Sequence, residues 1–362
     1  MYSLTFLFML LEEERERSRR DLKIQRKSLR DKSNPFDVDE TMFIKNYRLN
    51  KAAFTYVLDV LERNASSSRS SSISLLHRLS SVLRFLAEGG YQHGVGKDFD
   101  IPMAQSTFCC ILKEVLGLLQ SHLCPQWINL ELSNVEKREA KKDFFQKYGF
   151  PSAILCVDGT HIKIVAPTRD KFLYYNRKGY FSINAMIICD NKMKIRYVNA
   201  QFPGSNHDSH IWNVSNARYF LEKKYLDGER NTWLLGDAGY ALEPWLMTPF
   251  RTPPSGSPEE KYNKIHAKAR NIVERTIGVF KNRFRCLLGA RELHYEPWKA
   301  SQIVNVAAAL HNVCIHFRVN DESLENNSEP NILTESNEIL SSTYSEAASQ
   351  IREAICATLT RV

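Results

Sequence analysis

The hydrophobic pattern predicts helices through the first 149 residues. Apolar side chains recur every three or four residues in Met42–Arg63, Leu75–Glu88 and Phe108–Leu119. A glycine pair ends the second segment before the third begins, an order compatible with a helix-turn-helix whose second helix enters a major groove. A plain helical bundle is the alternative. The pattern alone favours the bundle, because Lys113 is the only base of the third segment.

The pattern changes at Phe150, where β-branched residues predict strands separated by short turns. A helix, a further short strand, a proline-rich loop and two long helices follow. This order predicts a mixed α/β domain in which three sequential strands lead into a crossover. The predicted elements are strands Ile154–Val165, Tyr180–Cys189 and Lys194–Phe202, helix His210–Lys224, strand Thr232–Leu235, and helices Tyr262–Arg285 and Ser301–Phe317.

These patterns divide the chain into four expected regions. Residues 1–40 form a charged helix or arm, and residues 41–149 form the helical, helix-turn-helix-like domain. Residues 150–318 form the α/β domain. Residues 319–362 are rich in Ser, Asn and Glu, which predicts an acidic, disordered tail with a short helix over Ser345–Thr360.

Charge is distributed unevenly along the 362 residues. The net charge is +8, but residues 319–362 hold eight acids and two bases, a charge of −6, which leaves +14 on residues 1–318. A basic body favours a polyanionic partner such as DNA, although a basic surface also serves solubility. The apolar run Tyr2–Leu11 is too short to span a bilayer, so we expect no membrane partner.

Four acids occupy positions that indicate a metal site rather than an ordinary surface. Asp158 interrupts an apolar strand, Asp237 ends a short strand, and Glu274 shares a helix face with His266 and Arg270. Asp208 lies between the third strand and the next helix. Carboxylates from several elements, without a cysteine or histidine cluster, favour Mg²⁺ or Mn²⁺ over zinc. Such ions can support a two-metal phosphoryl displacement.

Each acid also has a plainer interpretation. Asp158 and Asp237 could be turn residues, Asp208 could cap the following helix, and Glu274 could form a surface ion pair with its neighbour Arg275. Bases near the acids could hold phosphate oxygens instead. The candidate phosphate contacts are Lys163, Arg270, Arg275 and Lys281.

Several short motifs occur in an order that resembles the PIF/Harbinger transposases and their domesticated, nuclease-like relatives. The resemblance covers roughly residues 150–318. The motifs are Val157-Asp158-Gly159-Thr160-His161, Pro203-Gly204-Ser205 with Asp208, Leu235-Gly236-Asp237-Ala238-Gly239-Tyr240, Arg270-Asn271 with Glu274-Arg275 and Gly278, Lys281 with Arg283-Phe284, and Ala309-Leu310-His311-Asn312.

The resemblance implies a ribonuclease H-like fold with a DDE-type active site that cleaves DNA. It makes Asp158, Asp237 and Glu274 the catalytic carboxylates and Asp208 an additional metal ligand. It also implies a separate Myb/SANT-like DNA-binding partner and a nuclear location, with a cytoplasmic pool. DDE-type enzymes usually act as assemblies, so a homo-oligomer is an open alternative. A catalytically inactive DNA-binding or adaptor protein of the same descent is the second functional hypothesis.

Overall fold

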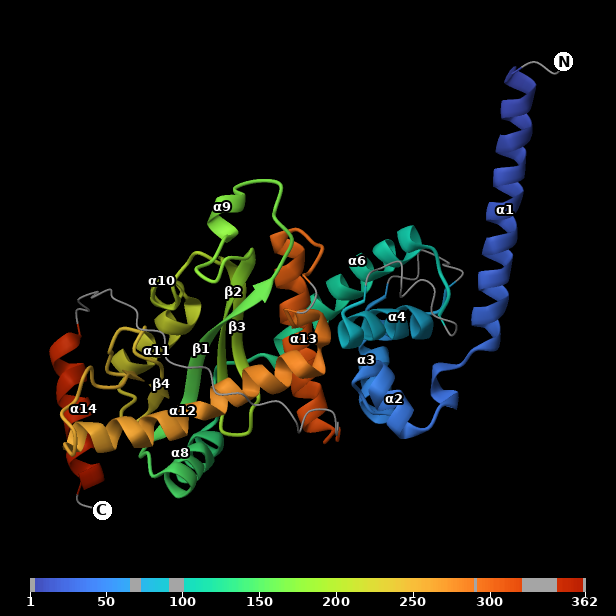
Figure 1. The fold of residues 1–362 in the computed structure, drawn as a ribbon. Helices are drawn as coiled ribbons and strands as arrows, with labels where there is room; N and C mark the ends of the chain where they lie inside the picture. Colours follow the sequence, from blue (N-terminus) through green and yellow to red (C-terminus); the bar gives the residue numbers. More distant parts are fainter. Residues whose placement is uncertain (1–3, 66–72, 91–100, 290–291, 321–343, 361–362) are drawn as a thin grey trace. The chain divides into compact units, whose positions relative to one another are not determined.

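A computed structural model describes residues 4–65, 73–90, 101–289, 292–320 and 344–360 (Figure 1). The chain separates into two compact units, residues 1–119 and 120–362. We expected the helical part to extend to residue 149. Instead α8 (Asn134–Tyr148) belongs with the second unit. It buries Phe144 and Ala140 in the two hydrophobic cores of that unit.

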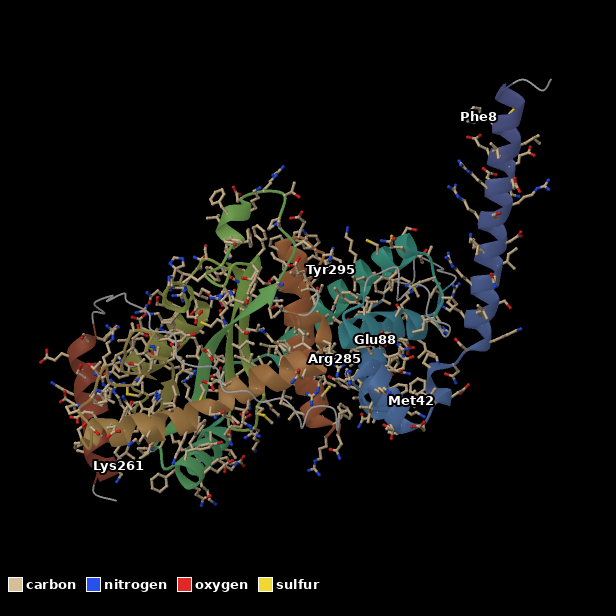
Figure 2. All side chains as sticks on the ribbon, in the orientation of Figure 1. Phe8, Met42, Glu88, Lys261, Arg285 and Tyr295 are labelled. Carbon is tan, nitrogen blue, oxygen red and sulfur yellow. The ribbon has the colours of Figure 1, made fainter. Side chains whose placement is uncertain are left out.

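The first unit is helical. A long α1 carries exposed apolar side chains near its start, among them Phe8, which is 63% exposed (Figure 2). The core gathers four aromatic rings, of Phe36, Phe43, Tyr47 and Phe54. Its helices are α1 (Leu4–Lys32), the 3-10 helix η1 (Pro35–Asp37), α2 (Glu40–Tyr47), α3 (Lys51–Asn64), α4 (Leu75–Glu88) and most of α6 (Gln105–His122).

The single helix predicted over Met42–Arg63 is wrong in one respect, because the chain forms α2 and α3 instead. Arg48 adopts a left-handed conformation with φ 58°, which ends α2. Asn50 then caps α3 by accepting a hydrogen bond from the backbone N–H of Ala53 at 2.9 Å. Residues 91–100, which would contain the turn of a helix-turn-helix, lie outside the described residues.

One described stretch, Gln105–Trp127, is long and apolar enough to cross a membrane by length and composition. Core helices of water-soluble proteins pass the same test. In this structure Phe108 and Leu112 of α6 are almost completely buried, and the ring of Phe108 lies 5.9 Å from that of Phe85 on α4. The apolar side of α6 is therefore used in packing against another helix of the first unit.

The second unit is built on a five-stranded mixed sheet in the order β3-β2-β1-β4-β5. β2 runs antiparallel to both of its neighbours, β1 and β3, whereas β4 and β5 run parallel to β1. Every residue of β2 is buried, as expected for a strand covered on both faces. The strands are β1 (Ala153–Lys163), β2 (Ser182–Asp190), β3 (Ile195–Pro203), β4 (Trp233–Leu235) and β5 (Leu246–Met247).

Helices cover both faces of this sheet (Figure 1). One core joins Cys156 of β1 to α12 and the C-terminal α14, and the other joins Val157 of β1 to α10. The remaining helices of the unit connect the strands or flank β3. They are α7 (Cys124–Trp127), α9 (Lys171–Tyr174), α10 (Asp208–Asn213), α11 (Asn216–Leu226), α12 (Pro258–Arg283), η2 (Arg285–Leu287), α13 (Pro297–His316) and α14 (Ser345–Thr360).

Sequence and structure agree on the type of most predicted elements here, and α7, α8 and α9 were not predicted. The helix predicted over His210–Lys224 is two helices, because Ser215 interrupts it and caps α11 by accepting from the Arg218 N–H at 3.0 Å. The short β5 was predicted as loop. Residues 321–343 of the expected disordered tail lie outside the described residues.

Candidate active site

Asp158 and Asp237 are brought together by the parallel pairing of β1 and β4. Cys156 lies opposite Leu235 in this pair. Asp158 follows two residues later on β1 and Asp237 two residues after the last residue of β4, and the charge of Asp237 acts on the Asp158 carboxyl group. After β4 the chain turns, and Asp237 Oδ1 accepts the Gly239 N–H at 2.9 Å. Asp237 is therefore a turn residue as well as a neighbour of Asp158, and the two interpretations do not exclude each other.

The interpretation of Asp158 as a turn residue is wrong, because β1 continues through it. Asp158 pairs with Ile187 and Gly159 with Met186 on β2. Side chains alternate along a strand, so Cys156 and Asp158 share one face while Val157 and Gly159 face the other. Cys156 Sγ lies 3.8 Å from the carbonyl oxygen of Ala269, which shows that the Asp158 face is the one covered by α12.

Asp208 approaches β1 at Gly159. A Cβ placed on Gly159 would lie 2.2 Å from Asp208 Oδ1, so only glycine leaves room for this carboxylate. Asn184 of β2 holds it by donating from Nδ2 to Asp208 Oδ1 at 2.7 Å. The cap of α10 is His207, and Asp208 is its first helical residue, so the helix-cap interpretation of Asp208 is not supported.

Sequence reasoning did not identify Gly159 or Asn184 as site residues. A glycine in the interior of a strand was the available signal for Gly159, since it often marks a close approach of another group. Asn184 gave no such signal, because nothing in the sequence relates a polar residue of β2 to a loop beyond β3.

Arg270 of α12 lies between two of the predicted carboxylates. Its Nη1 is 3.2 Å from Asp158 Oδ2, and its Nη2 donates to Glu274 one helical turn further on. The Arg270 side chain is only 13% exposed. The third residue of the predicted helix face, His266, is buried, and its Nε2 lies 3.1 Å from the carbonyl oxygen of Met247. His266 is thus a packing residue, while Glu274 reaches Asp158 through Arg270.

Two of the carboxyl groups, those of Asp158 and Asp208, have raised pKa values. Burial raises the pKa of Asp158 to about 7; the charge of Arg270 opposes this shift, whereas Asp237 and Asp208 add to it. Burial also raises the pKa of Asp208, against the hydrogen bond from Asn184 and together with the charge of Asp237. The cluster therefore carries more negative charge than Arg270 neutralises, which favours an additional cation.

The donor chemistry of this cluster fits a hard divalent ion, since all four groups offer carboxylate oxygens. In the described part of the chain, however, no three His, Cys, Asp or Glu side chains converge closely enough to share an ion. Arg270 lies between Asp158 and Glu274, so its positive charge separates these two carboxylates.

The predicted phosphate contacts are distributed unequally around the cluster. Lys163 Nζ lies 3.5 Å from Glu292 and 5.3 Å from the centre of the Tyr180 ring. Lys281 donates from Nζ to the carbonyl oxygen of His161 at 2.9 Å, and burial, helped by the charge of Lys178, lowers its pKa to about 8. Arg275 is exposed. Arg270 is bound to carboxylates in this structure, so it can reach a phosphate only after releasing them.

The closing motif residues His311 and Asn312 are structural. Asn312 accepts the Ile195 N–H at 2.8 Å, and its Nδ2 donates to the carbonyl oxygens of Ile195 and Trp127. The His311 ring nitrogens lie 3.0 Å from the Met193 carbonyl oxygen and from Arg283 Nη1. These contacts anchor α13 to the start of β3, away from the carboxylates.

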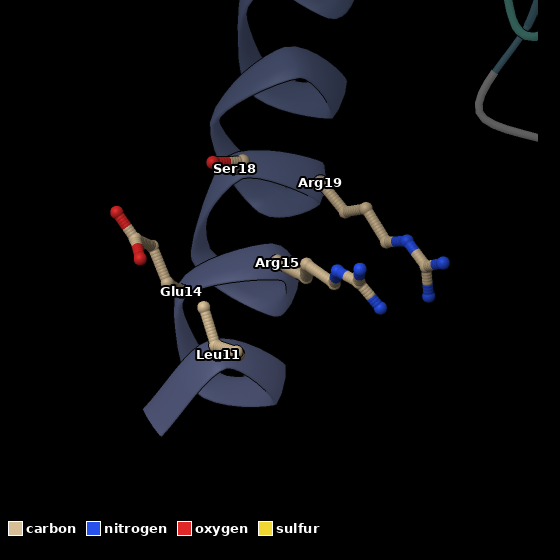
Figure 3. Close-up of a pocket in the computed structure, with 5 residues that line it drawn as sticks. All are labelled: Leu11, Glu14, Arg15, Ser18 and Arg19. Carbon is tan, nitrogen blue, oxygen red and sulfur yellow. The ribbon is translucent and has the colours of Figure 1, made fainter. Parts of the chain in front are cut away.

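A shallow hollow on α1 offers no competing site. Its lining residues all come from this one helix, so no second element closes over a ligand (Figure 3). They are Leu11, Glu14, Arg15, Ser18 and Arg19.

Comparisons with known proteins agree with the motif order. Residues 157–312 match the family described as DDE superfamily endonuclease. The human protein named "Putative nuclease HARBI1" is 29% identical over 283 residues, which cover 77% of this chain and 79% of that protein. The Arabidopsis thaliana protein named "Protein ALP1-like" is 25% identical over 307 residues, 79% of this chain and 73% of that protein. No solved structure matches significantly.

Proposed function

The chain belongs to the DDE superfamily endonucleases, in the group derived from Harbinger transposases, and on this basis we propose that it is a divalent-metal-dependent DNA nuclease. One observation carries the proposal: Asp158, Asp208 and Asp237 come from three separate segments of the chain and lie close enough for the charges of Asp208 and Asp237 to act on the Asp158 carboxyl group, whose side chain is only 19% exposed. A protein keeps such a group of like charges, largely shielded from water, at a cost in stability, which is typical of a site that binds a cation or does chemistry.

The proposal includes a ribonuclease H-like fold. Three sequential antiparallel strands followed by two parallel strands, in the order β3-β2-β1-β4-β5, support it. So does the placement of the acids, with Asp158 on the first strand, Asp237 just after the fourth and Glu274 on a later helix.

Asp158, Asp237 and Glu274 would hold Mg²⁺ or Mn²⁺ on the α12 side of the sheet, with Asp208 as an additional ligand. DDE superfamily endonucleases generally use divalent metals, and two bound ions would supply the positive charge that stabilises an in-line displacement at a phosphodiester. The residues of the chain position the carboxylates. Gly159 and Asn184 position Asp208, and the parallel register of β1 and β4 positions Asp158 beside Asp237.

Arg270 has two alternative sets of partners in this proposal. In the structure it forms ion pairs with Asp158 and Glu274. When Arg270 releases these carboxylates, its guanidinium becomes available for a phosphate, the role expected from the sequence. A guanidinium can bind either group, because carboxylates and phosphates both offer two oxygens to its paired N–H donors. Lys163 at the end of β1 and the exposed Arg275 would add attraction for the DNA backbone.

A cleavage assay tests the proposal. The full chain is incubated with linear and supercoiled DNA and Mg²⁺ or Mn²⁺, as wild type, Asp158→Asn and Asp237→Asn. Asp227→Asn, an exposed acid after α11, is the matched control. We expect cleavage by wild type and control, reduced by at least about a hundredfold in the two site variants. Equal cleavage by wild type and Asp158→Asn would refute the proposal.

The second candidate function is a DNA-binding or adaptor protein without cleavage. The ion pairs of Arg270 favour it, because Asp158 and Glu274 already have a positive partner within the chain. Calorimetry separates the two candidates. Mn²⁺ binding that is lost in Asp237→Asn supports the nuclease, whereas absence of binding, or binding unchanged by that substitution, supports the adaptor.

The partners belong to the proposal as well. The charge of +14 on residues 1–318 supports DNA as the substrate. We propose that a Myb/SANT-like protein supplies part of the sequence recognition and that the chain acts in the nucleus, with a cytoplasmic pool. Co-precipitation from nuclear and cytoplasmic fractions tests both points, and absence of the chain from nuclei would contradict the second.

A further inference from the structure

The connector between β1 and β2, residues 164–181, carries an unusual combination of exposed side chains. Phe172 is 71% exposed and Tyr175 is 52% exposed, the two most exposed aromatic rings of this segment. Four bases and one acid accompany them, a net charge of +3. These charged residues are Arg169, Lys171, Arg177, Lys178 and Asp170.

The connector is an ordered structure rather than a loose loop. Tyr175 and Phe181 form an antiparallel bridge, and their rings meet edge to face at 5.3 Å. Between them Asn176 organises a tight turn that Gly179 completes with φ +80°. On the other side Val165 donates its N–H to the carbonyl oxygen of Leu293 at 3.1 Å. The exposed rings are therefore presented on a fixed support.

This support is attached to the carboxylate site. The Ser205 N–H donates to the carbonyl oxygen of Leu173 at 3.1 Å, so α9 holds the loop that leads into Asp208. The close fit at Gly204, where a Cβ would lie 3.0 Å from the Tyr174 carbonyl oxygen, fixes the same junction. The positive charge of Arg177 acts on the Asp208 carboxyl group. Figure 1 shows α9 projecting beyond the end of the sheet.

We propose that this connector is a docking arm for unpaired DNA bases beside the cleavage site, with Phe172 and Tyr175 as stacking surfaces. The proposal rests on the proposed nuclease function and assigns a substrate feature to it. Exposed aromatic rings bind bases by stacking, which requires base faces that a closed duplex does not offer. The lysine and arginine side chains around the rings attract the phosphates of the same strand. A purely structural role would bury the rings, and a purely electrostatic one would not need them.

Binding measurements on the full chain test the arm. Fluorescence anisotropy in metal-free buffer with chelator compares a blunt duplex with the same duplex carrying a short single-stranded overhang. We expect wild type to prefer the overhang by about tenfold, and Phe172→Ala and Tyr175→Ala each to remove most of this preference. Tyr219→Ala, an aromatic residue 69% exposed on α11, is the matched control and should change neither affinity.

A second pair of variants distinguishes aromatic stacking from nonspecific apolar contact. Phe172→Tyr keeps a flat ring and should retain the preference, whereas Phe172→Leu keeps an apolar surface without one and should lose it. The fluorescence of an adenine analogue in the overhang should be quenched by wild type and by Phe172→Tyr, but not by Phe172→Leu. Arg177→Ala should weaken binding to both DNAs equally and flatten the salt dependence.

Three outcomes would overturn the arm. The first is a wild type without preference for the overhang, and the second is that the alanine variants keep the preference. The third is that the alanine substitutions dissociate a dimer in sedimentation, which would make the rings a contact between two copies of the chain. Because these measurements need no cleavage, they are distinguishable from failure of the nuclease proposal, which is decided by Asp158→Asn.

Discussion

The carboxylate of Asp208 occupies the space that a side chain at residue 159 would fill, with Oδ1 only 2.2 Å from an ideal Cβ on Gly159. Asn184 holds this carboxylate from the neighbouring strand at 2.7 Å. The absence of a side chain on β1 therefore allows an acid from α10 to reach the strand that carries Asp158.

Gly159→Ala tests this relationship. The added methyl group would displace Asp208 and break its bond to Asn184, so we expect at least about tenfold less cleavage and about 1–3 kcal/mol lower stability to urea, the usual cost of overpacking. Gly278→Ala on α12 is the matched control, because nothing lies within 4 Å of its Cβ position. A double variant, Gly159→Ala with Asp208→Ala, should regain stability but not cleavage. If Gly159→Ala cleaves normally, Asp208 is not a part of the site.

Arg270→Gln tests whether the guanidinium competes with metal. Its removal leaves Asp158 and Glu274 without their positive partner. We expect Mn²⁺ affinity measured by calorimetry to rise about tenfold, which corresponds to about 1.4 kcal/mol, and the metal-free protein to be less stable. Arg275→Gln, the exposed neighbour, should have no effect on either quantity. Unchanged Mn²⁺ affinity in Arg270→Gln would show that metal and arginine do not exclude each other.

Asn312→Ala tests the structural role of the closing motif. The side chain makes three hydrogen bonds to the backbone of Ile195 and Trp127 and is 1% exposed. Its loss leaves buried backbone groups without partners, so we expect about 2–4 kcal/mol lower stability in urea unfolding. Gln302→Ala, on the same helix and partly exposed, is the control. Loss of cleavage in Asn312→Ala without loss of stability would point to a catalytic role instead.

Acid should destabilise the protein through His311. Burial and the charge of Arg283 lower the pKa of His311 to about 3, against an ordinary value of 6.5. The unfolded chain therefore binds a proton that the folded chain does not, and the contribution of His311 to stability is complete above pH 6.5 and declines as pH falls from about 6.5 towards 3.

The variant His311→Gln isolates this effect. Urea unfolding at several pH values should show that the stability difference between wild type and variant becomes smaller as the pH falls below 6.5. The comparison is made against the variant because Asp158, whose pKa is raised, contributes with the opposite sign over nearly the same range. A difference that is independent of pH would contradict a neutral buried His311.

The sequence by itself determined the element types and the identity of the acids. Hydrophobic periodicity is local, so it located β1, β2, β3 and α12 to within a few residues, and a polar residue inside an apolar strand marked Asp158. Periodicity did not predict the helix interruptions at the capping residues Asn50 and Ser215, because apolar spacing continues across them.

Only the tertiary structure decided how the acids are arranged. The pairing of β1 with β4 brings Asp237 close to Asp158, whose side chain lies on the α12 face, whereas Asp208 reaches the sheet at Gly159, and neither register nor face is encoded in local spacing. Arg270 enters the cluster because α12 packs with Ala269 against Cys156, which turns the next residue towards Asp158. These placements depend on contacts between residues far apart in the sequence, up to 113 positions for Cys156 and Ala269, and they form only when the two faces of the sheet are packed.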